Sequence, residues 1–568
     1  MVDTGLRRMC VPVLAAMLAA GLAGCVPSPD GPPDTFGLDL SLDGATDADG
    51  AIVFIVDGVH AGIFREMLDA GELPAIDKYF VRRGLYAPRV VANVPSVTLA
   101  NLTSITTGKF PGHHGVTGIN WFDRNQLIWR DYATIAQKNT LDCDYTAKTI
   151  YEHFPERTTV SVFFQPHRGT TKFIENWTSA GPPYFFGWYE FVDRLTLSRF
   201  SLVAEIARQR AEWPAVTAVY LLAPDFAAYG HGASSAEYRD ALRHTDRQIG
   251  RVLGDVERAG LLDNLHIAFV SDHGMVDVDE HFVLEDFLRD EVGLDVARKH
   301  LWEETPFEKR LDYYDRYSCV YYGSGDRYAA ICLRKPVRGA KGYVTGYEPW
   351  PVRPTAADLG SYPSAKARDA GGAWSARLPL DKRGVDLFDV LTSRPEVHAV
   401  AWRQREDAVR LRTKAGEVEF RRPAGPGGGI AYRVVDGADP LGWAGAVPET
   451  ALAGEPMGSR AWLEATIDTE YPDLPAQLLA YFRARRAGDI VAFAAEGWDF
   501  SNVHSGGHGG LSPGDMHVPM LIAGPGVPMG EVKAARAVDL VPTILSLLGR
   551  PVPEDLDGRL LAPAPRNE

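Results

Sequence analysis

The sequence predicts an α/β fold, in which a mostly parallel central sheet is flanked by helices and an inserted mixed α/β region interrupts the core. Three runs of apolar, largely β-branched residues at 51–56, 216–222 and 266–270 are typical of strands buried on both faces, as in parallel sheets. Between the second and third runs, apolar residues recur at helical spacing over 238–256, behind two serine N-cap candidates at 234–235.

Length, charge and composition are those of a globular protein with room for one large α/β domain and an insertion. Of the 568 residues, 45% are apolar and 23% are charged. The formal net charge of −15, without any basic stripe along the chain, argues against a nucleic-acid partner.

Residues 1–25 have the pattern of an export signal. Arg7 and Arg8 precede the apolar run VPVLAAMLAAGLA, which is too short to span a bilayer comfortably. The run ends in LAGC, which resembles the lipobox of bacterial lipoproteins, so we expect lipidation at Cys25 and a membrane-anchored protein of the bacterial cell envelope or periplasm. A cleaved signal with an incidental cysteine is the alternative, and both predict export. Residues 26–49, rich in Pro, Gly and Asp, are a predicted flexible tether.

The stretch from Val94 to Gly115 is expected to present a nucleophile. Thr98 opens a run of helix-compatible residues that Gly108 and Pro111 bring to an end. Because a threonine hydroxyl is a poor nucleophile at neutral pH, the prediction requires a group elsewhere in the chain that activates it.

Carboxylates and imidazoles follow the three predicted strands. Residues in this position lie at the sheet edge where open α/β folds bind ligands. Each one alone is equally well explained as a turn or core residue, but together they favour a site. A late histidine lies among four glycines, GGHGG, which gives it no packing role of its own. The candidates are Asp57, Asp225, His231, Asp272, His273 and His508.

These residue types indicate a metal centre. Carboxylate oxygens and imidazole nitrogens without thiolates suit catalytic zinc, or manganese less well, and two ions need about six ligands with open positions. Two ions roughly 4 Å apart can hold the attacking and the leaving oxygen of an in-line displacement at phosphorus. One of them would also lower the pKa of the Thr98 hydroxyl.

Residues 277–488 form the predicted insertion, because alternating strand-like segments there are joined by long Gly/Pro-rich stretches. We interpret the insertion as a cap or lid over the sheet edge, and a separate carbohydrate-binding or partner-binding module is the alternative. Within it, Cys319 and Cys332 could close a short loop in an oxidising compartment. Its aromatic residues could line a binding surface or pack in a core; they include Tyr313, Tyr314, Tyr317, Tyr321, Tyr322, Trp350 and Trp402.

The core is predicted in two parts, 50–276 and 489–568. In the second part, 489–493 and 518–523 are strand-like. Residues 539–548 form a predicted helix with Asp539 as its N-cap and Gly549 as its stop.

The order of motifs along the chain supports a family assignment. The motifs are a strand ending in Asp-Gly at 57–58, P-x-x-T-x-x-N at 95–101 followed by T-G-x-x-P-x-x-H-G, P-D at 224–225 with a nearby histidine, S-D-H-G-M at 271–275, and H-G at 508–509. This order resembles the alkaline phosphatase superfamily, and within it the type I phosphodiesterase/nucleotide pyrophosphatase branch. The resemblance covers about half of the chain. Sulfatases share the fold but need a C/S-x-P-x-R motif, and the closest approach, at Cys25, lacks the arginine.

The resemblance implies two zinc ions and a covalent intermediate. Thr98 would attack phosphorus to give a phospho-threonine, which water would then hydrolyse. Asn101 matches the asparagine of P-x-x-T-x-x-N, and Asn120 is the nearest match to a phosphate-binding asparagine. The implied ligands are Asp57, Asp272 and His273 for one zinc, with Thr98 bridging to it, and Asp225, His231 and His508 for the other.

Two departures from the family pattern affect these assignments. The usual spacing D-x-x-x-H would place the histidine at position 229, where this chain has Tyr229, and His231 comes two residues later. A longer loop after Asp225 would be needed to bring His231 to the zinc. Asn120 also lies one residue later than the pattern, so a turn residue is its alternative role.

We therefore expect an exported hydrolase of phosphoric esters, acting on a small phosphorylated substrate that is a phosphodiester, a nucleotide pyrophosphate or a monoester. The alternative is a catalytically inactive envelope lipoprotein that binds a cell-surface polymer through its aromatic-rich insertion.

Overall fold

The computed structural model describes residues 49–561, except 135–136, 138–139, 176, 340–343, 366, 369–373, 376–383 and 424–427. The predicted signal peptide with Cys25, and the predicted tether up to residue 48, lie outside the described residues. Among the helices of the described part, none is both long and apolar enough to cross a membrane.

A nine-stranded sheet forms the core, and it confirms the predicted α/β fold. From β8 to β6 all neighbouring strands are parallel, whereas β25 runs antiparallel to both β8 and β2. The three predicted strands lie side by side in it as β8, β1 and β7. The spatial order is β26 (Gly530–Glu531), β2 (Gly84–Val91), β25 (His517–Ala523), β8 (Leu265–Ser271), β1 (Gly50–Val56), β7 (Val216–Leu221), β5 (Thr159–Val162) and β6 (Lys172–Ile174), with β27 (Ala535–Arg536) also paired to β2.

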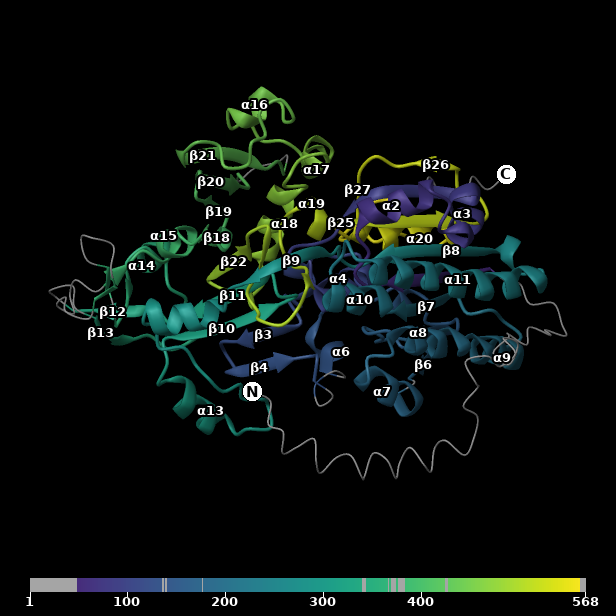
Figure 1. Ribbon diagram of the computed structural model, residues 1–568, viewed down its shortest axis with the longest axis horizontal. Helices are drawn as coiled ribbons and strands as arrows, with labels where there is room; N and C mark the ends of the chain where they lie inside the picture. Colours follow the sequence, from purple (N-terminus) through teal and green to yellow (C-terminus); the bar gives the residue numbers. More distant parts are fainter. Residues whose placement is uncertain are drawn as a thin grey trace.

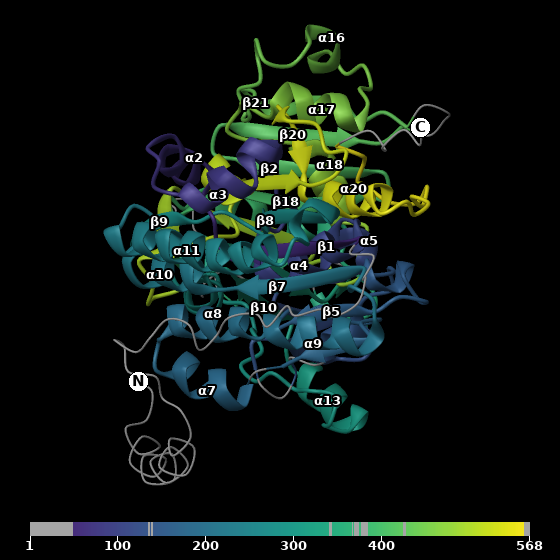
Figure 2. The same cartoon turned by 90° about the vertical axis from the view of Figure 1, so that its right-hand side faces the viewer.

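Helices cover both faces of this sheet, as the continuous apolar character of β1 predicts. Alternate residues of β1 belong to two different hydrophobic cores, with Phe54 in one and Val53 in the other. The first core also contains residues of α2 (Ala61–Asp69), α3 (Pro74–Tyr79), α9 (Phe200–Arg210) and α11 (Ala236–Arg258), and the second those of α4 (Thr98–Thr107) and α20 (Leu540–Leu547). Figure 2 shows α2, α3 and α11 on one side of the sheet and α20 on the other.

A second, seven-stranded sheet is antiparallel throughout, and most of its strands come from the predicted insertion. Figure 1 shows it to the left of the core. Its order is β10 (Cys319–Ser324), β11 (Tyr328–Leu333), β22 (Ile490–Ala494), β18 (Val397–Arg405), β19 (Ala408–Thr413), β20 (Gly416–Arg421) and β21 (Ala431–Gly437). The strand β22 follows the insertion in sequence but pairs with β11 and β18 in this sheet.

The connecting elements complete the described structure. They include α5 (Pro111–His114), β3 (Asn120–Asp123), β4 (Ile128–Asp131), α6 (Leu141–Asp144), α7 (Trp177–Phe185), α8 (Tyr189–Ser198), α10 (Ala223–His231), β9 (Val276–His281), α12 (Leu284–Asp286), α13 (Phe307–Tyr314), β12 (Pro336–Arg338), β13 (Val344–Tyr347), α14 (Ala356–Leu359), α15 (Leu387–Thr392), α16 (Glu449–Leu452), α17 (Ser459–Thr466), α18 (Leu474–Tyr481), β23 (Gly497–Asp499), β24 (Gly506–Gly507) and α19 (Pro513–Met516).

The two buried cysteines of the second sheet are free, so the possible short loop between them is not closed. Cys319 pairs with Leu333 across the strands, and Cys332 pairs with Val320. Because successive side chains of a strand point to opposite faces, the two thiols lie on opposite sides of the sheet. They accordingly belong to different hydrophobic cores, which precludes a disulfide without rebuilding the strands.

The predicted helix at 539–548 forms as α20, and Gly549 after it has a φ of 67°. Asp539 precedes the helix but makes no capping hydrogen bond to it. Its carboxylate instead accepts the backbone N–H groups of Arg536 and Arg559 at 2.9 and 2.8 Å. The predicted N-cap therefore joins two segments around the helix start.

A buried ion pair links the C-terminal segment to the turn before Thr98. Arg536 donates to both carboxylate oxygens of Asp473 at 2.7 and 2.6 Å, and both side chains are nearly inaccessible to solvent. Gln477 donates to Asp473 at 2.9 Å and accepts the backbone N–H of Val94 at 3.2 Å. Through Gln477, the pair thus supports the turn before Thr98.

Replacing Asp473 with asparagine is expected to lower the free energy of unfolding by about 3 kcal/mol, because Arg536 would keep a buried charge without its counter-ion. Urea unfolding followed by circular dichroism would measure the change. The matched control is Asp312→Asn, which breaks the exposed pair between Asp312 and Arg316 and should have little effect. Equal effects of the two changes would contradict the assignment.

Candidate active site

Thr98 is the first residue of α4, which begins where a buried turn ends. Val97 before it is extended, with φ −130° and ψ 149°. The N-terminus of a helix carries the positive end of its dipole, which favours negative charge on a group placed there. The helix ends at Gly108, whose φ of 68° is left-handed, as the sequence predicts.

Asn101 holds the turn that precedes Thr98. Its side-chain amide donates to the carbonyl oxygens of Asn93, Pro95 and Val97 at 3.2, 2.9 and 3.2 Å. Its oxygen accepts the backbone N–H of Asn93 at 2.6 Å. Asn101 is fully buried, so the structure gives it a positioning role for Thr98.

Asp57, Asp272 and His273 meet beside Thr98 at the carboxyl ends of β1 and β8. Their ligand atoms lie within 4.8 Å of one another, and all three side chains are buried. The Nε2 atom of His273 is 3.0 Å from the Thr98 hydroxyl, 3.1 Å from Asp57 Oδ1 and 3.4 Å from Asp272 Oδ2. The parallel pairing of β1 and β8 places both acidic residues at the same edge.

A second group shares His273 and adds Asp225 and His508. Asp225 lies in the first turn of α10, directly after β7, and His508 follows β24. The rings of His273 and His508 are stacked at 3.5 Å. The structure therefore brings together five of the six predicted Asp and His ligands around Thr98.

Both histidines present Nε2 to the cluster. The Nδ1 atom of His273 is 3.0 Å from the carbonyl oxygen of Gly274, and that of His508 is 2.8 Å from the carbonyl oxygen of Ser96. A carbonyl oxygen only accepts, so each Nδ1 carries a proton, and Nε2 is the atom that the neutral ring can offer to a metal. Hydrogen bonds of this kind orient imidazoles that bind metals.

The glycines beside His508 allow it to approach the nucleophile turn. A Cβ atom at position 506 would lie only 2.3 Å from the carbonyl oxygen of Ala228 in α10. Gly509 has a φ of 110°, which disfavours other residues. The backbone of His508 also bonds to the β10–β11 turn, donating to Gly325 at 2.8 Å and accepting from Arg327 at 3.1 Å. The second sheet therefore helps to place His508.

The charges of the cluster are unbalanced without a cation. Burial and the charge of Asp57 raise the pKa of both Asp225 and Asp272 well above the ordinary range. Burial alone lowers the pKa of His273, but Asp272 and Asp57 outweigh it and raise the pKa to about 10. Burial and the nearby His273 lower the pKa of His508. Buried carboxylates this close together require positive charge or protons.

Three buried oxygens of the cluster accept no hydrogen bond: Asp57 Oδ1, Asp225 Oδ1 and Asp272 Oδ2. Buried polar atoms are normally satisfied, so orphaned oxygens at one place indicate a missing partner. The donor set is carboxylate oxygen and imidazole nitrogen, which suits zinc. The residues thus fit a divalent cation, which would satisfy these oxygens and balance their charge.

Two other candidates lie outside the cluster. His231 is exposed at the end of α10, because that helix continues without a break from Ala223 to His231 and no longer loop forms. Six helical residues after Asp225, its side chain leaves the helix on a different face. Asn120 begins β3 and donates to the carbonyl oxygen of Gly323 at 3.2 Å. It is not among the residues that line the cavity described next.

A cavity of about 300 Å³ opens beside Thr98, Asp57 and Asp225. Most of its wall is apolar or aromatic, and Tyr220 also donates a hydrogen bond to Asp57. Except for Tyr229, the aromatic residues of this wall could not be singled out from the sequence, because they come from several elements and share no spacing. The aromatic residues that line the cavity are Tyr132, Phe163, Phe173, Tyr184, Phe185, Tyr220, Phe226 and Tyr229.

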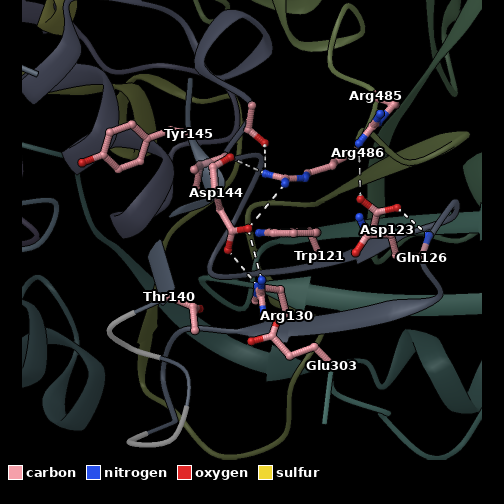
Figure 3. Close-up of polar contacts among 12 residues, drawn as sticks. Trp121, Asp123, Gln126, Arg130, Thr140, Asp144, Tyr145, Glu303, Arg485 and Arg486 are labelled. Carbon is pink, nitrogen blue, oxygen red and sulfur yellow. Dashed lines mark hydrogen bonds and ion pairs between the residues drawn. The ribbon is translucent and has the colours of Figure 1, made fainter. Parts of the chain in front are cut away.

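A buried polar network fixes the wall formed by Tyr132. Figure 3 shows Asp144 between Arg130 and Arg486. Arg130 donates to the Asp144 carboxylate at 2.8 Å, Arg486 donates to its backbone carbonyl at 2.6 Å, and the Tyr132 hydroxyl donates to its carboxylate at 2.8 Å. Arg486 also lies 3.8 Å from the ring of Trp121. Because Arg486 comes from the predicted insertion, the network ties that region to the cavity wall.

Comparison with known proteins agrees with this geometry. The family model for type I phosphodiesterase / nucleotide pyrophosphatase matches residues 51–333. The chain belongs to this family. It is a branch of the alkaline phosphatase superfamily, and its members are hydrolases of phosphoric esters. The matched part contains Asp57, Thr98, Asp225 and the Asp272-His273 pair, and His508 lies beyond it.

The relatives found are distant, and each match covers only part of the relative. Ectonucleotide pyrophosphatase/phosphodiesterase family member 1 of Mus musculus is 25% identical over 39% of this chain and 24% of its own length. An uncharacterized pyrophosphatase/phosphodiesterase of Schizosaccharomyces pombe is 22% identical over 49% of this chain and 52% of its own. Venom phosphodiesterase CdcPDE of Crotalus durissus collilineatus is 24% identical over 40% of this chain and 26% of its own length. The chain thus spans about a quarter to a half of the length of these relatives.

Proposed function

We propose that this chain is a metal-dependent hydrolase that cleaves a phosphodiester or a nucleotide pyrophosphate through a covalent phosphate on Thr98. The observation that carries the proposal is the position of the Thr98 hydroxyl, 3.0 Å from His273 Nε2 at the edge of a buried cluster of carboxylates and imidazoles. A nucleophile beside such a cluster is the arrangement that phosphoryl transfer needs.

Asp57, Asp272 and His273 would hold one divalent ion, and Asp225 and His508 would bind a second; zinc is the ion proposed. Ions bound there would polarise the phosphoryl group and lower the pKa of the Thr98 hydroxyl. Thr98 Oγ1 would then form a bond to phosphorus while the bond to the leaving alkoxide or phosphate breaks. Water would cleave the phospho-threonine, which restores the Thr98 hydroxyl and releases the phosphoryl product.

The cavity supports a substrate with an apolar or aromatic group on the phosphate. Phe163, Tyr184 and Phe226 line it within the same space as Thr98. Aromatic walls bind flat or apolar groups by burial and stacking. A diester or a nucleotide pyrophosphate carries such a group, whereas inorganic phosphate does not.

The remaining parts of the proposal concern organisation and location. We propose that residues 277–488 together with β22 form the inserted unit and act as a cap, because its β10–β11 turn and Arg486 support His508 and the cavity wall. We also propose that the protein is exported and that lipidation at Cys25 anchors it to a membrane of the cell envelope.

Zinc content and ester hydrolysis test the proposal together. We expect purified protein to contain zinc. We also expect it to hydrolyse bis-p-nitrophenyl phosphate faster than p-nitrophenyl phosphate, because one p-nitrophenyl group of the diester leaves while the other stays on the phosphorus and can bind in the cavity. Loss of the rate with a chelator and recovery with zinc should follow. Protein that holds no zinc and cleaves neither ester would instead support the polymer-binding lipoprotein.

A further inference from the structure

The cluster contains too few donors for two equivalent metal positions. Its two overlapping groups comprise five side chains, because both count His273. A single Nε2 lone pair binds one ion, and Nδ1 of His273 is engaged with the Gly274 carbonyl. Catalytic zinc usually has three protein ligands and an open position. If Asp57, Asp272 and His273 serve one ion, Asp225 and His508 alone remain for the other.

Tyr229 occupies the position on α10 from which a third protein ligand could reach the second ion. It lies one helical turn after Asp225 on α10, so the two side chains share a face of that helix. Its ring contacts the ring of His508 edge-on at 5.6 Å, and it lines the cavity together with Asp225 and Thr98. A neutral phenol is a much poorer zinc ligand than the imidazole or carboxylate found at such sites.

The described residues near Tyr229 offer no better donor. The ring of His504 lies 4.7 Å from the Tyr229 ring, and its Nδ1 is 2.5 Å from the carboxylate of Asp326. Among the described residues, His504 and Asp326 belong to no group with ligand spacing to Asp225 or His508. Neither residue therefore supplies a third ligand for the second ion.

We propose that the second metal position has only two protein ligands, Asp225 and His508, and takes its third from a phosphoryl oxygen of the substrate. This inference rests on the proposed function. It makes the first ion resident, whereas the second binds weakly until phosphate is present. By linkage, phosphate must raise the affinity for the second zinc by the same factor by which that zinc raises the affinity for phosphate.

The expected difference in affinity is large. Loss of a residue that only orients a metal ligand typically costs 10–100-fold in metal affinity, so absence of a ligand itself should cost at least on the order of 100-fold. The Tyr229→His substitution puts an imidazole one turn from Asp225 and should raise the affinity for the second zinc at least about tenfold. The Tyr229→Phe substitution removes only the hydroxyl and is the matched control.

The experiment is a zinc titration of metal-free wild type, Tyr229→His and Tyr229→Phe in competition with a chelator, with and without inorganic phosphate as the probe. We expect one tight zinc in wild type and Tyr229→Phe, and two in Tyr229→His. Inorganic phosphate should tighten the second zinc of wild type, a result that does not depend on folding of any variant.

Three results would overturn the inference. Two zinc ions of similar affinity in phosphate-free wild type would mean that a third protein ligand exists. A weaker second zinc in Tyr229→Phe than in wild type would identify the phenol as that ligand. If inorganic phosphate did not change the affinity of wild type for the second zinc, a phosphoryl oxygen could not be its third ligand. All three leave the proposed function standing, whereas wild type that binds no zinc would refute both.

Discussion

Replacing Thr98 with alanine is expected to lower kcat for bis-p-nitrophenyl phosphate by about 10³-fold or more, since the variant has no oxygen to attack phosphorus. Alanine is a strong helix former, so α4 and its surroundings should be retained. Zinc content and melting temperature should therefore stay at the wild-type values. Initial rates at saturating substrate, measured beside the two companion variants described next, check the prediction.

Two companion variants separate the nucleophile from its surroundings. Thr98→Ser keeps the hydroxyl and should retain much of the activity. Ser96→Ala removes a hydroxyl that lies in the same turn but donates to the carbonyl oxygen of Gly510 at 2.9 Å, so it should leave a phospho-enzyme that can still be trapped by acid quenching. Wild-type turnover by Thr98→Ala would mean that water attacks the substrate directly.

The core strands could be predicted because their signal is local. A short, continuous run of apolar and largely β-branched residues favours a strand buried on both faces, and β1, β7 and β8 form where such runs occur. The run at 518–523 also becomes a strand, β25, but it is antiparallel to its neighbours. Direction depends on the connection between strands, and the run itself carries no information about it.

The ligands could be predicted for a related reason. Asp57 and Asp272 follow neighbouring parallel strands, so the topology alone brings them to one edge. His231 lies outside the cluster because the longer loop that its assignment needs does not form. Pro224 sits in the first turn of a continuous helix, α10. Helical periodicity then places Tyr229, and not His231, beside Asp225.

The cavity wall lay beyond sequence analysis. Tyr132, Tyr184 and Phe226 come from separate elements, and only the packing of those elements brings them together. The support for Tyr132 depends on Arg486, which is more than three hundred residues away in sequence. Contacts of this kind leave no local pattern, so no spacing rule would have found them.

Replacing Asp272 with asparagine is expected to remove most of the stabilisation that zinc gives the protein. In wild type, zinc at 100 times its Kd should add about 2.7 kcal/mol to the free energy of unfolding. The variant lacks a ligand of the tighter ion, so zinc should add little. Without metal, the variant should be the more stable protein, because one of three clustered carboxylates is gone. The amide oxygen can still accept the backbone N–H of Gly58, which lies 3.4 Å from Asp272 Oδ1.

Without metal, the stability that the asparagine variant gains over wild type should also increase with pH. Burial and the charge of Asp57 raise the pKa of Asp272 in the folded protein well above the ordinary range of an aspartate. As pH rises above the ordinary aspartate range, the unfolded chain releases this proton before the folded protein does, so metal-free wild type loses more stability than the asparagine variant. Thermal melts with chelator at several pH values would measure the gap, which should widen with pH. Asp473→Asn is the matched control, because it removes a buried carboxylate outside the cluster and should destabilise the protein with or without zinc. The same loss from both variants would show that Asp272 supports the fold and does not hold a metal.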